Sequence, residues 1–140
     1  MKVSIIAVGK IRESYLKDAA AEYIKRLSAW TSVQVIEVKE DERILPRIPP
    51  NAFVYVLAVN GKRMSSQVFS KHLEENMLNG FSHLAFIIGG HNGLCTEVQQ
   101  AGDISLSFSD MTFPHQLMRV ILLEQIYRCF KIINNEPYHK

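Results

Sequence analysis

Three short segments of this 140-residue sequence combine glycines, aromatic residues and small polar residues in a way that favours ligand binding. They are residues 58–62 (Ala-Val-Asn-Gly-Lys), 89–94 (Gly-Gly-His-Asn-Gly-Leu) and 107–114 (Ser-Phe-Ser-Asp-Met-Thr-Phe-Pro). Each segment follows an apolar run that predicts a buried strand. Because ligands of open parallel sheets bind beyond the carboxyl ends of the strands, we expect the three segments to converge on one site.

The residue types in these segments are compatible with a nucleotide-like ligand. The glycines of residues 89–94 could let backbone N–H groups approach a ligand, but a tight turn between a strand and a helix explains them equally well. Their spacing is neither a dinucleotide fingerprint nor a phosphate loop. In the third segment Phe108, Met111 and Phe113 could stack on an adenine ring, or they could fill the core.

Further candidate side chains lie in the last quarter of the sequence. His115 and Arg119 are one helical turn apart beside the third segment, so they could contact an anion or a base; a structural histidine at a helix start is the alternative. The chain ends in Tyr138, His139 and Lys140, which bring together an aromatic ring, an imidazole and a cation. Residue type alone favours a frayed terminus here.

Other classes of protein are disfavoured. The sequence has no GxSxG and no HExxH motif, and its five histidines lack metal spacing, so we expect neither a serine hydrolase nor a metal site. Cys95 and Cys129 form no CxxC motif and are expected to be reduced core thiols. The longest apolar runs are far shorter than the roughly 20 residues of a membrane helix, and no secretion signal is recognisable. We therefore expect a cytoplasmic protein.

The charge distribution is uneven along the chain. The net charge is +2, but residues 1–70 carry 11 Lys and Arg against 7 Asp and Glu, whereas residues 71–140 carry 5 against 7. This excess of base in the first half permits a polyanionic partner without requiring one.

Hydrophobic patterns predict strands that alternate with helices. Strands are expected at residues 2–9, 33–38, 52–59, 83–88 and 104–108, with Asn60-Gly61 ending the third. Helices are expected at residues 13–30, after a Ser65-Ser66 cap with Val68, Phe69, Leu73 and Met77 on the inner face, at 96–101, and at 114–134. Residues 39–51 should form a loop with at most one helical turn. This order predicts one α/β domain over residues 1–140, with a doubly wound parallel sheet.

The helix predicted at residues 114–134 is apolar nearly all round. A helix of this kind must be covered on two sides, and one sheet offers a single face. A partner subunit is an economical cover, so we expect a homodimer.

Several segments together resemble one family. They are residues 3–10, 86–94, 106–115, Arg119-Val120, residues 124–128 and the terminal Pro-Tyr-His-Lys. In order along the whole chain they resemble the bacterial large-subunit ribosomal RNA pseudouridine N3-methyltransferases of the SPOUT superfamily. The resemblance implies S-adenosylmethionine as methyl donor, a homodimer, and 23S rRNA in the assembled ribosome as substrate. It also implies a deep trefoil knot, which general rules of chain topology would have argued against.

The same resemblance implies roles for individual residues. The cofactor would be held by Leu57, Gly89, Phe108, Ser109, Asp110, Met111, Thr112 and Phe113. Tyr138, His139 and Arg128 form the expected catalytic set, in which His139 removes the N3 proton and Tyr138 stacks on the base. His115, Arg119 and Lys140, together with Arg128, are expected to meet phosphate or carbonyl oxygens of the RNA.

The sequence departs from the family pattern in two places. It has His91-Asn92 where many relatives have Pro-Glu, and residues 39–51 replace a segment that in relatives carries an additional helix. These departures leave a second hypothesis open, a non-catalytic dimeric module that binds a nucleotide or RNA without turnover. The complete Tyr138-His139-Lys140 ending argues against that alternative.

Overall fold

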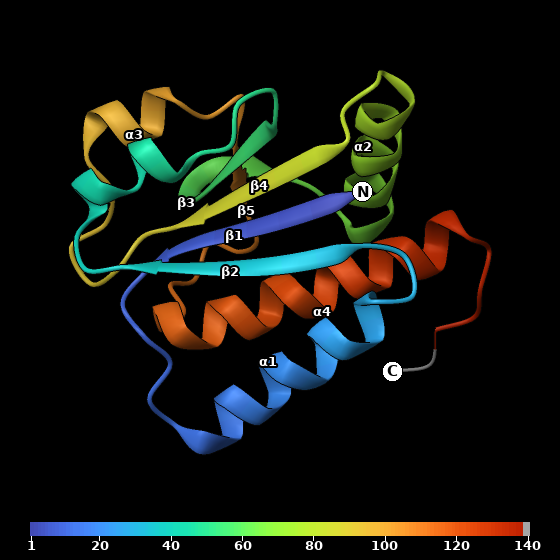
Figure 1. Cartoon of the computed structure of the whole chain (residues 1–140), viewed down its shortest axis with the longest axis horizontal. Coiled ribbons are helices and arrows are strands. Elements are labelled where there is room, and N and C mark those ends of the chain that lie inside the picture. Colours follow the sequence, from blue (N-terminus) through green and yellow to red (C-terminus); the bar gives the residue numbers. More distant parts are fainter. Residues whose placement is uncertain (139–140) are drawn as a thin grey trace.

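The computed structural model describes residues 1–138 and contains five strands that alternate with helices (Figure 1). The elements are β1 (Lys2–Val8), α1 (Ser14–Leu27), β2 (Ser32–Val38), the 3-10 turns η1 (Asp41–Arg43) and η2 (Leu45–Arg47), β3 (Phe53–Arg63), α2 (Ser66–Leu78), β4 (His83–Ile88), α3 (Thr96–Gln100), β5 (Ile104–Ser107) and α4 (His115–Ile133).

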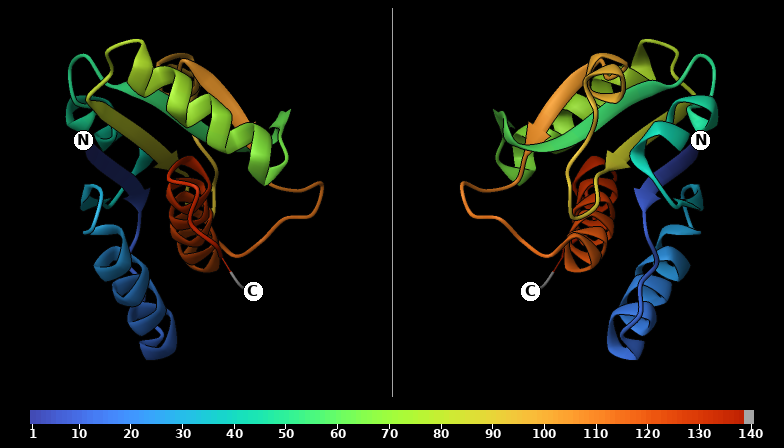
Figure 2. Two further views of the ribbon diagram at one scale, coloured as in Figure 1. Left: turned by 90° about the vertical axis from the view of Figure 1, so that its right-hand side faces the viewer. Right: turned by 90° about the vertical axis from the view of Figure 1, so that its left-hand side faces the viewer.

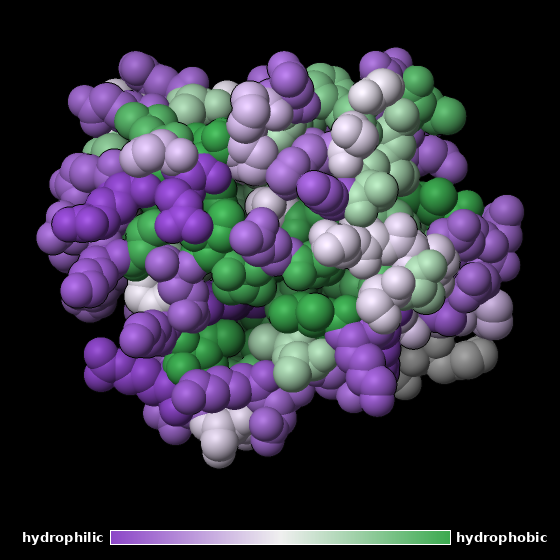
Figure 3. All heavy atoms as spheres, in the orientation of Figure 1, coloured by the Kyte–Doolittle hydropathy of each residue, from purple (hydrophilic) through white to green (hydrophobic). Residues whose placement is uncertain are grey.

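All strand pairs in the sheet are parallel, in the order β2-β1-β4-β3-β5. One apolar cluster joins α1, α2 and α4 to one face, and a second joins α3 and the segment between β2 and β3 to the other. The predicted doubly wound α/β sheet is thereby confirmed. Apolar residues also gather in the middle of the face that carries the edge strand β2, among hydrophilic surroundings (Figure 3).

The third strand is longer than the sequence predicts. Asn60-Gly61 does not end it, because β3 continues to Arg63 through a bulge. Leu57 and Lys62 both pair with Leu106 of β5, so residues 58–61 leave the ladder. A side chain at Gly61 would place its Cβ 2.7 Å from the backbone of Ser105. Glycine is required here because two backbones approach closely, and not because the chain turns back.

The helix α4 is covered by its own chain more fully than expected. It packs against the sheet and is flanked by α1 on one side and α2 on the other. Trp30 stacks on Phe130 with ring centroids 5.9 Å apart, and Tyr23 lies 6.0 Å from Tyr127. Among the large apolar side chains of this described helix, only Ile132 is exposed. The apolar circumference of α4 therefore does not by itself require a partner subunit.

Smaller differences concern the ends and faces of helices. Ser65 caps α2 as predicted, since its Oγ accepts a hydrogen bond from the Val68 N–H at 3.1 Å. Val68, predicted to face the core, is 52% exposed. Pro114 is the N-cap of α4 and not part of its first turn. Residues 39–51 contain two 3-10 turns where at most one was expected. None of the helices in residues 1–138 is both long and apolar enough to cross a membrane.

Candidate functional site

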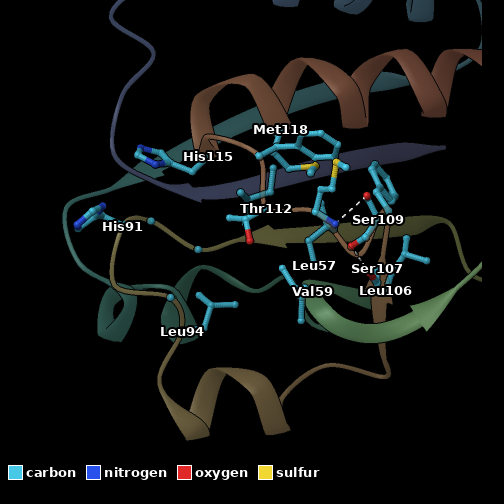
Figure 4. Close-up of a pocket in the computed structure, with 18 of the residues that line it drawn as sticks. Leu57, Val59, His91, Leu94, Leu106, Ser107, Ser109, Thr112, His115 and Met118 are labelled. Atoms are coloured by element: carbon cyan, nitrogen blue, oxygen red, sulfur yellow. Dashed lines mark hydrogen bonds between the residues drawn. The ribbon is translucent and has the colours of Figure 1, made fainter.

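A cavity of about 360 Å³ opens at the bulge of β3 and at the carboxyl ends of β4 and β5, and the three segments singled out in the sequence form its walls (Figure 4). Seven of the eight residues expected to hold a cofactor line it: Leu57, Gly89, Phe108, Ser109, Met111, Thr112 and Phe113. The eighth, Asp110, does not line the cavity and instead pairs with Arg63 at the surface. The predicted convergence of the loops is present, while the binding roles of their residues stay predictions.

The glycine segment forms a tight turn against the cavity. The N–H of Gly93 donates to the carbonyl oxygen of Gly90 at 3.1 Å, and Gly93 has a φ of +76°. A Cβ on Gly89 would lie 3.0 Å from Leu94 Cγ and 3.1 Å from the carbonyl group of Gly93. The turn therefore leaves no room for a side chain at Gly89, whose backbone lines the cavity. The tight-turn interpretation is confirmed, while the approach of this segment to a ligand stays a prediction.

The segment between β5 and α4 swings away from the body of the molecule before it returns to the helix (Figure 2). It is held by its own hydrogen bonds. Ser107 Oγ donates to the Ser109 carbonyl oxygen at 3.0 Å, and the Met111 N–H donates to Ser109 Oγ at 2.9 Å. Phe108 packs edge-on against Phe69 at 6.1 Å, so it contributes to both the core and the cavity. Met111 is 73% exposed at the rim.

The sequence did not single out some of the cavity residues. The lining also includes Ile88, Gln99, Leu106 and Met118. Met118 could have been found, because it is three residues after His115 and so lies on the same side of α4. Gln99 could not have been found, because the approach of α3 to the cavity depends on how the preceding glycine turn folds.

His115 and Arg119 lie near each other but face different surroundings. His115 lines the cavity, and its Nε2 is 3.7 Å from the position of a Cβ built on Gly9. Arg119 is only 2% exposed, with its guanidinium donating to Glu37 Oε2 at 2.5 Å and to the Gly9 carbonyl oxygen at 3.1 Å. Its Nε is buried without a hydrogen-bond partner among the described residues. The Arg119 guanidinium is thus held inside the fold in this structure, and its predicted contact with substrate stays a prediction.

The end of the chain is ordered against α4 as far as Tyr138. The Tyr138 hydroxyl donates to Glu124 Oε2 at 2.9 Å, and its ring lies 5.2 Å from that of Tyr127. The Arg128 guanidinium lies over the Tyr138 ring at 4.4 Å and pairs with Glu124 at 2.7 Å. Partial burial, and then the hydrogen bond to Glu124, raise the pKa of Tyr138, so it remains a neutral donor. The frayed-terminus interpretation is wrong for Tyr138; His139 and Lys140 lie outside the described residues.

This tail cluster, which consists of Glu124, Tyr127, Arg128 and Tyr138, is separated from the cavity of the same chain. The cavity reaches α4 at His115 and Met118. Along a helix that rises about 1.5 Å per residue, Glu124 lies roughly 9 Å and Arg128 roughly 15 Å beyond Met118. Tyr138, which is expected to stack on the base beside the cofactor, therefore does not lie at the cavity of its own chain.

Among residues 1–138 there is no group of three or more His, Cys, Asp or Glu side chains that could hold a metal ion. Both cysteines are free thiols; Cys129 is buried and Cys95 is half-buried. Burial raises the pKa of the Cys129 thiol to about 12, so it is not a nucleophile at neutral pH.

The sequence matches a known family over nearly its whole length. Residues 1–139 match the family described as "Predicted SPOUT methyltransferase". The chain belongs to this family and is a methyltransferase. It is 51% identical to the ribosomal RNA large subunit methyltransferase H of Carboxydothermus hydrogenoformans and 48% identical to that of Exiguobacterium sibiricum, and both alignments cover all of both chains. The family resemblance of the sequence is thereby confirmed.

Solved structures with little sequence identity share the fold. A methylase family protein from Haemophilus influenzae superposes with a TM-score of 0.61 at 10% identity, over 99% of this chain and 70% of that one. TrmJ from Z. mobilis gives 0.56 at 10% identity, over 98% and 72%.

Proposed function

We propose that this protein transfers a methyl group from S-adenosylmethionine to N3 of a pseudouridine in 23S rRNA of assembled ribosomes, in the cytoplasm. The observation that carries the proposal is the cavity of about 360 Å³ at the bulge of β3 and the carboxyl ends of β4 and β5. The full-length similarity to two enzymes named ribosomal RNA large subunit methyltransferase H supports rRNA as substrate. The pseudouridine and its N3 atom follow from the family that the sequence resembles.

The cavity suits S-adenosylmethionine in size and in chemistry. Its volume is within the range of about 300 to 1,000 Å³ typical of small-molecule sites. Leu57, Phe108 and Phe113 supply apolar walls for a flat ring. The β3 bulge frees the backbone of residues 58–61 from β5, and Gly89 presents backbone without a side chain. Backbone groups next to apolar walls can recognise the edge of an adenine ring.

In this proposal the residues of the chain bind the methyl donor, position the RNA base and accept its proton. When bound, S-adenosylmethionine supplies an electrophilic methyl group on a sulfonium. The walls of the cavity hold the donor and exclude water, and His115 at the cavity meets the RNA. His139 accepts the N3 proton and Tyr138 stacks on the base, while Arg128 and Lys140 meet phosphate or carbonyl oxygens. No metal is needed, because the transfer is a direct displacement that depends on positioning.

We also propose that the active form is a homodimer, and the trefoil knot follows from the family that the sequence resembles. The support is geometric, since Arg128, on which the Tyr138 ring packs, lies roughly 15 Å along α4 from Met118 in the cavity of its own chain, and methyl transfer requires contact. In a homodimer, the tail of a second copy can reach this cavity and provide the contact that methyl transfer requires. Light scattering at micromolar concentration should report twice the monomer mass. A stable monomer that methylates ribosomes would rule this arrangement out.

Cofactor binding separates this proposal from the non-catalytic alternative. Calorimetric titration with S-adenosylmethionine should give a saturable site on each chain, and S-adenosylhomocysteine should compete for it. A nucleotide- or RNA-binding module without turnover has no need of either molecule. Absence of binding to both, with the protein folded, would overturn the methyltransferase proposal for this cavity.

A further inference from the structure

The segment between β2 and β3 touches the glycine turn that forms one wall of the cavity. We propose that this segment braces the turn, with Asp41 as a positioning residue for cofactor binding although it does not line the cavity. The inference rests on the proposed function, because it assumes that the cavity holds S-adenosylmethionine. It gives a task to residues 39–51, where the sequence departs from the family pattern that it resembles.

The difference in length is visible in the alignments. They run over 159 positions and cover all of this 140-residue chain, so 159 − 140 = 19 positions are present in the relatives and missing here. What this chain has after β2 is a compact pair of 3-10 turns, η1 and η2.

The first contact is made by Asp41 of this segment. Its Oδ2 accepts a hydrogen bond from the Cys95 N–H at 2.6 Å, across 54 positions of sequence. Cys95 is the N-cap of α3 and directly follows Leu94, which lines the cavity. On the other side Gln99 Nε2 donates to the Leu94 carbonyl oxygen at 2.8 Å. The backbone at the end of the glycine turn is therefore tied from two sides.

A second contact is apolar. Ile44 lies between η1 and η2 and is fully buried. It belongs to the same apolar cluster as Val98 of α3, and Leu94 and Cys95 pack against that cluster. The short segment thus fills the space under the glycine turn as well as holding its backbone.

The position of Leu94 decides how the turn faces the cavity. A Cβ built on Gly89 would lie 3.0 Å from Leu94 Cγ and 3.1 Å from the carbonyl group of Gly93. Leu94 therefore lies directly over the Gly89 backbone, and both residues line the cavity. A shift of the Cys95 amide would move the preceding residue, Leu94, and so change the shape of this wall.

The charge of Asp41 supports this task. Desolvation is the largest single effect on the pKa of Asp41 and raises it. The hydrogen bond from the Cys95 N–H and several smaller contributions lower it, and their sum is larger, so the pKa is lowered. Asp41 is therefore an ionised acceptor at neutral pH. Hydrogen bonds to charged groups are stronger than neutral ones, so this contact can hold a loop that has few others.

The test compares Asp41→Ala, the conservative Asp41→Asn and the control Glu40→Ala on the neighbouring exposed carboxylate. Kd for S-adenosylmethionine is measured by calorimetry, and kcat and KM on ribosomes are measured separately. Asp41→Ala should raise Kd about tenfold, which corresponds to 1.4 kcal/mol. Asp41→Asn should recover most of the affinity, Glu40→Ala should match the parent, and kcat at saturating cofactor should be unchanged. Ile44→Val should raise Kd a few-fold by the apolar route.

Hydrogen exchange at the Cys95 amide reports on the brace independently of any ligand. Its rate should increase in Asp41→Ala and not in Glu40→Ala. Unchanged exchange, or faster exchange with a Kd within twofold of the parent, would overturn the proposal. If the parent itself binds no S-adenosylmethionine, the proposed function fails, and faster exchange in Asp41→Ala would still show that the brace exists.

Discussion

The buried pair of Arg119 and Glu37 allows a quantitative test of how α4 is held to the sheet. The Arg119 side chain is 2% exposed and the Glu37 side chain is 36% exposed, with 2.5 Å between Nη1 and Oε2. Removing one partner of a buried pair costs about 3 to 5 kcal/mol, because the other charge is left uncompensated. The two partners differ in exposure, so the two removals should differ in cost.

Glu37→Gln should be the more damaging change. It leaves a fully buried guanidinium with the Gly9 carbonyl and a neutral amide, and we expect a loss of about 3 kcal/mol. Arg119→Met leaves a carboxylate that can turn toward water, so we expect about 2 kcal/mol. The double variant buries no charge and should lose about 2 kcal/mol. The coupling is then about 3 kcal/mol, the upper end of what contacting residues show.

Urea unfolding followed by circular dichroism measures each free energy of unfolding. The exposed pair of Arg26 and Glu22, at 2.7 Å, is the control. Its side chains are 45% and 52% exposed, so Arg26→Met should leave the midpoint close to that of the parent. Strict additivity of Arg119→Met and Glu37→Gln would refute the account of Arg119 as a buried structural cation.

Three further predictions concern the cavity, the tail and pH. Gly89→Val should weaken S-adenosylmethionine binding more than about tenfold in calorimetry and leave ribosome affinity nearly unchanged; equal loss of both would assign the glycine to folding. Deletion of Tyr138 to Lys140 should leave cofactor affinity within a few-fold but lower ribosome methylation by about 100-fold or more, and full turnover would contradict the roles of the tail. Burial lowers the pKa of His72 and His83, so the unfolded chain binds more protons in acid. The free energy of unfolding should be level above about pH 6.5 and fall below it, and a thermal midpoint that is constant from pH 7.5 to 5.5 would exclude this.

The sequence predicted those features of the fold that depend on residues close together in the chain. The strand His83–Ile88 has the bounds expected from its apolar run, and Ser65 caps α2 as expected from its position. The cavity loops converge because parallel strands bring their carboxyl ends to one edge. These features depend on neighbouring residues and on a general rule of sheet topology.

Features that depend on distant partners were not predictable. Asn60-Gly61 has the composition of a turn, and its place in a bulge depends on the approach of Ser105 in β5. Helical spacing put Arg119 beside His115, but the sequence could not indicate that Glu37, 82 positions away, would hold it inside the fold. The packing of α1 and α2 against α4 likewise depends on contacts between residues that are distant in the sequence.

The central claim is methyl transfer to rRNA, and one measurement tests it most directly. Purified protein is incubated with labelled S-adenosylmethionine and ribosomes from a strain that lacks the corresponding gene, and the rRNA is digested and analysed by mass spectrometry. The account predicts one added methyl group per large subunit, on N3 of a pseudouridine in 23S rRNA, and none with free 23S rRNA. Ribosomes that remain unmethylated by a protein that binds S-adenosylmethionine would contradict it.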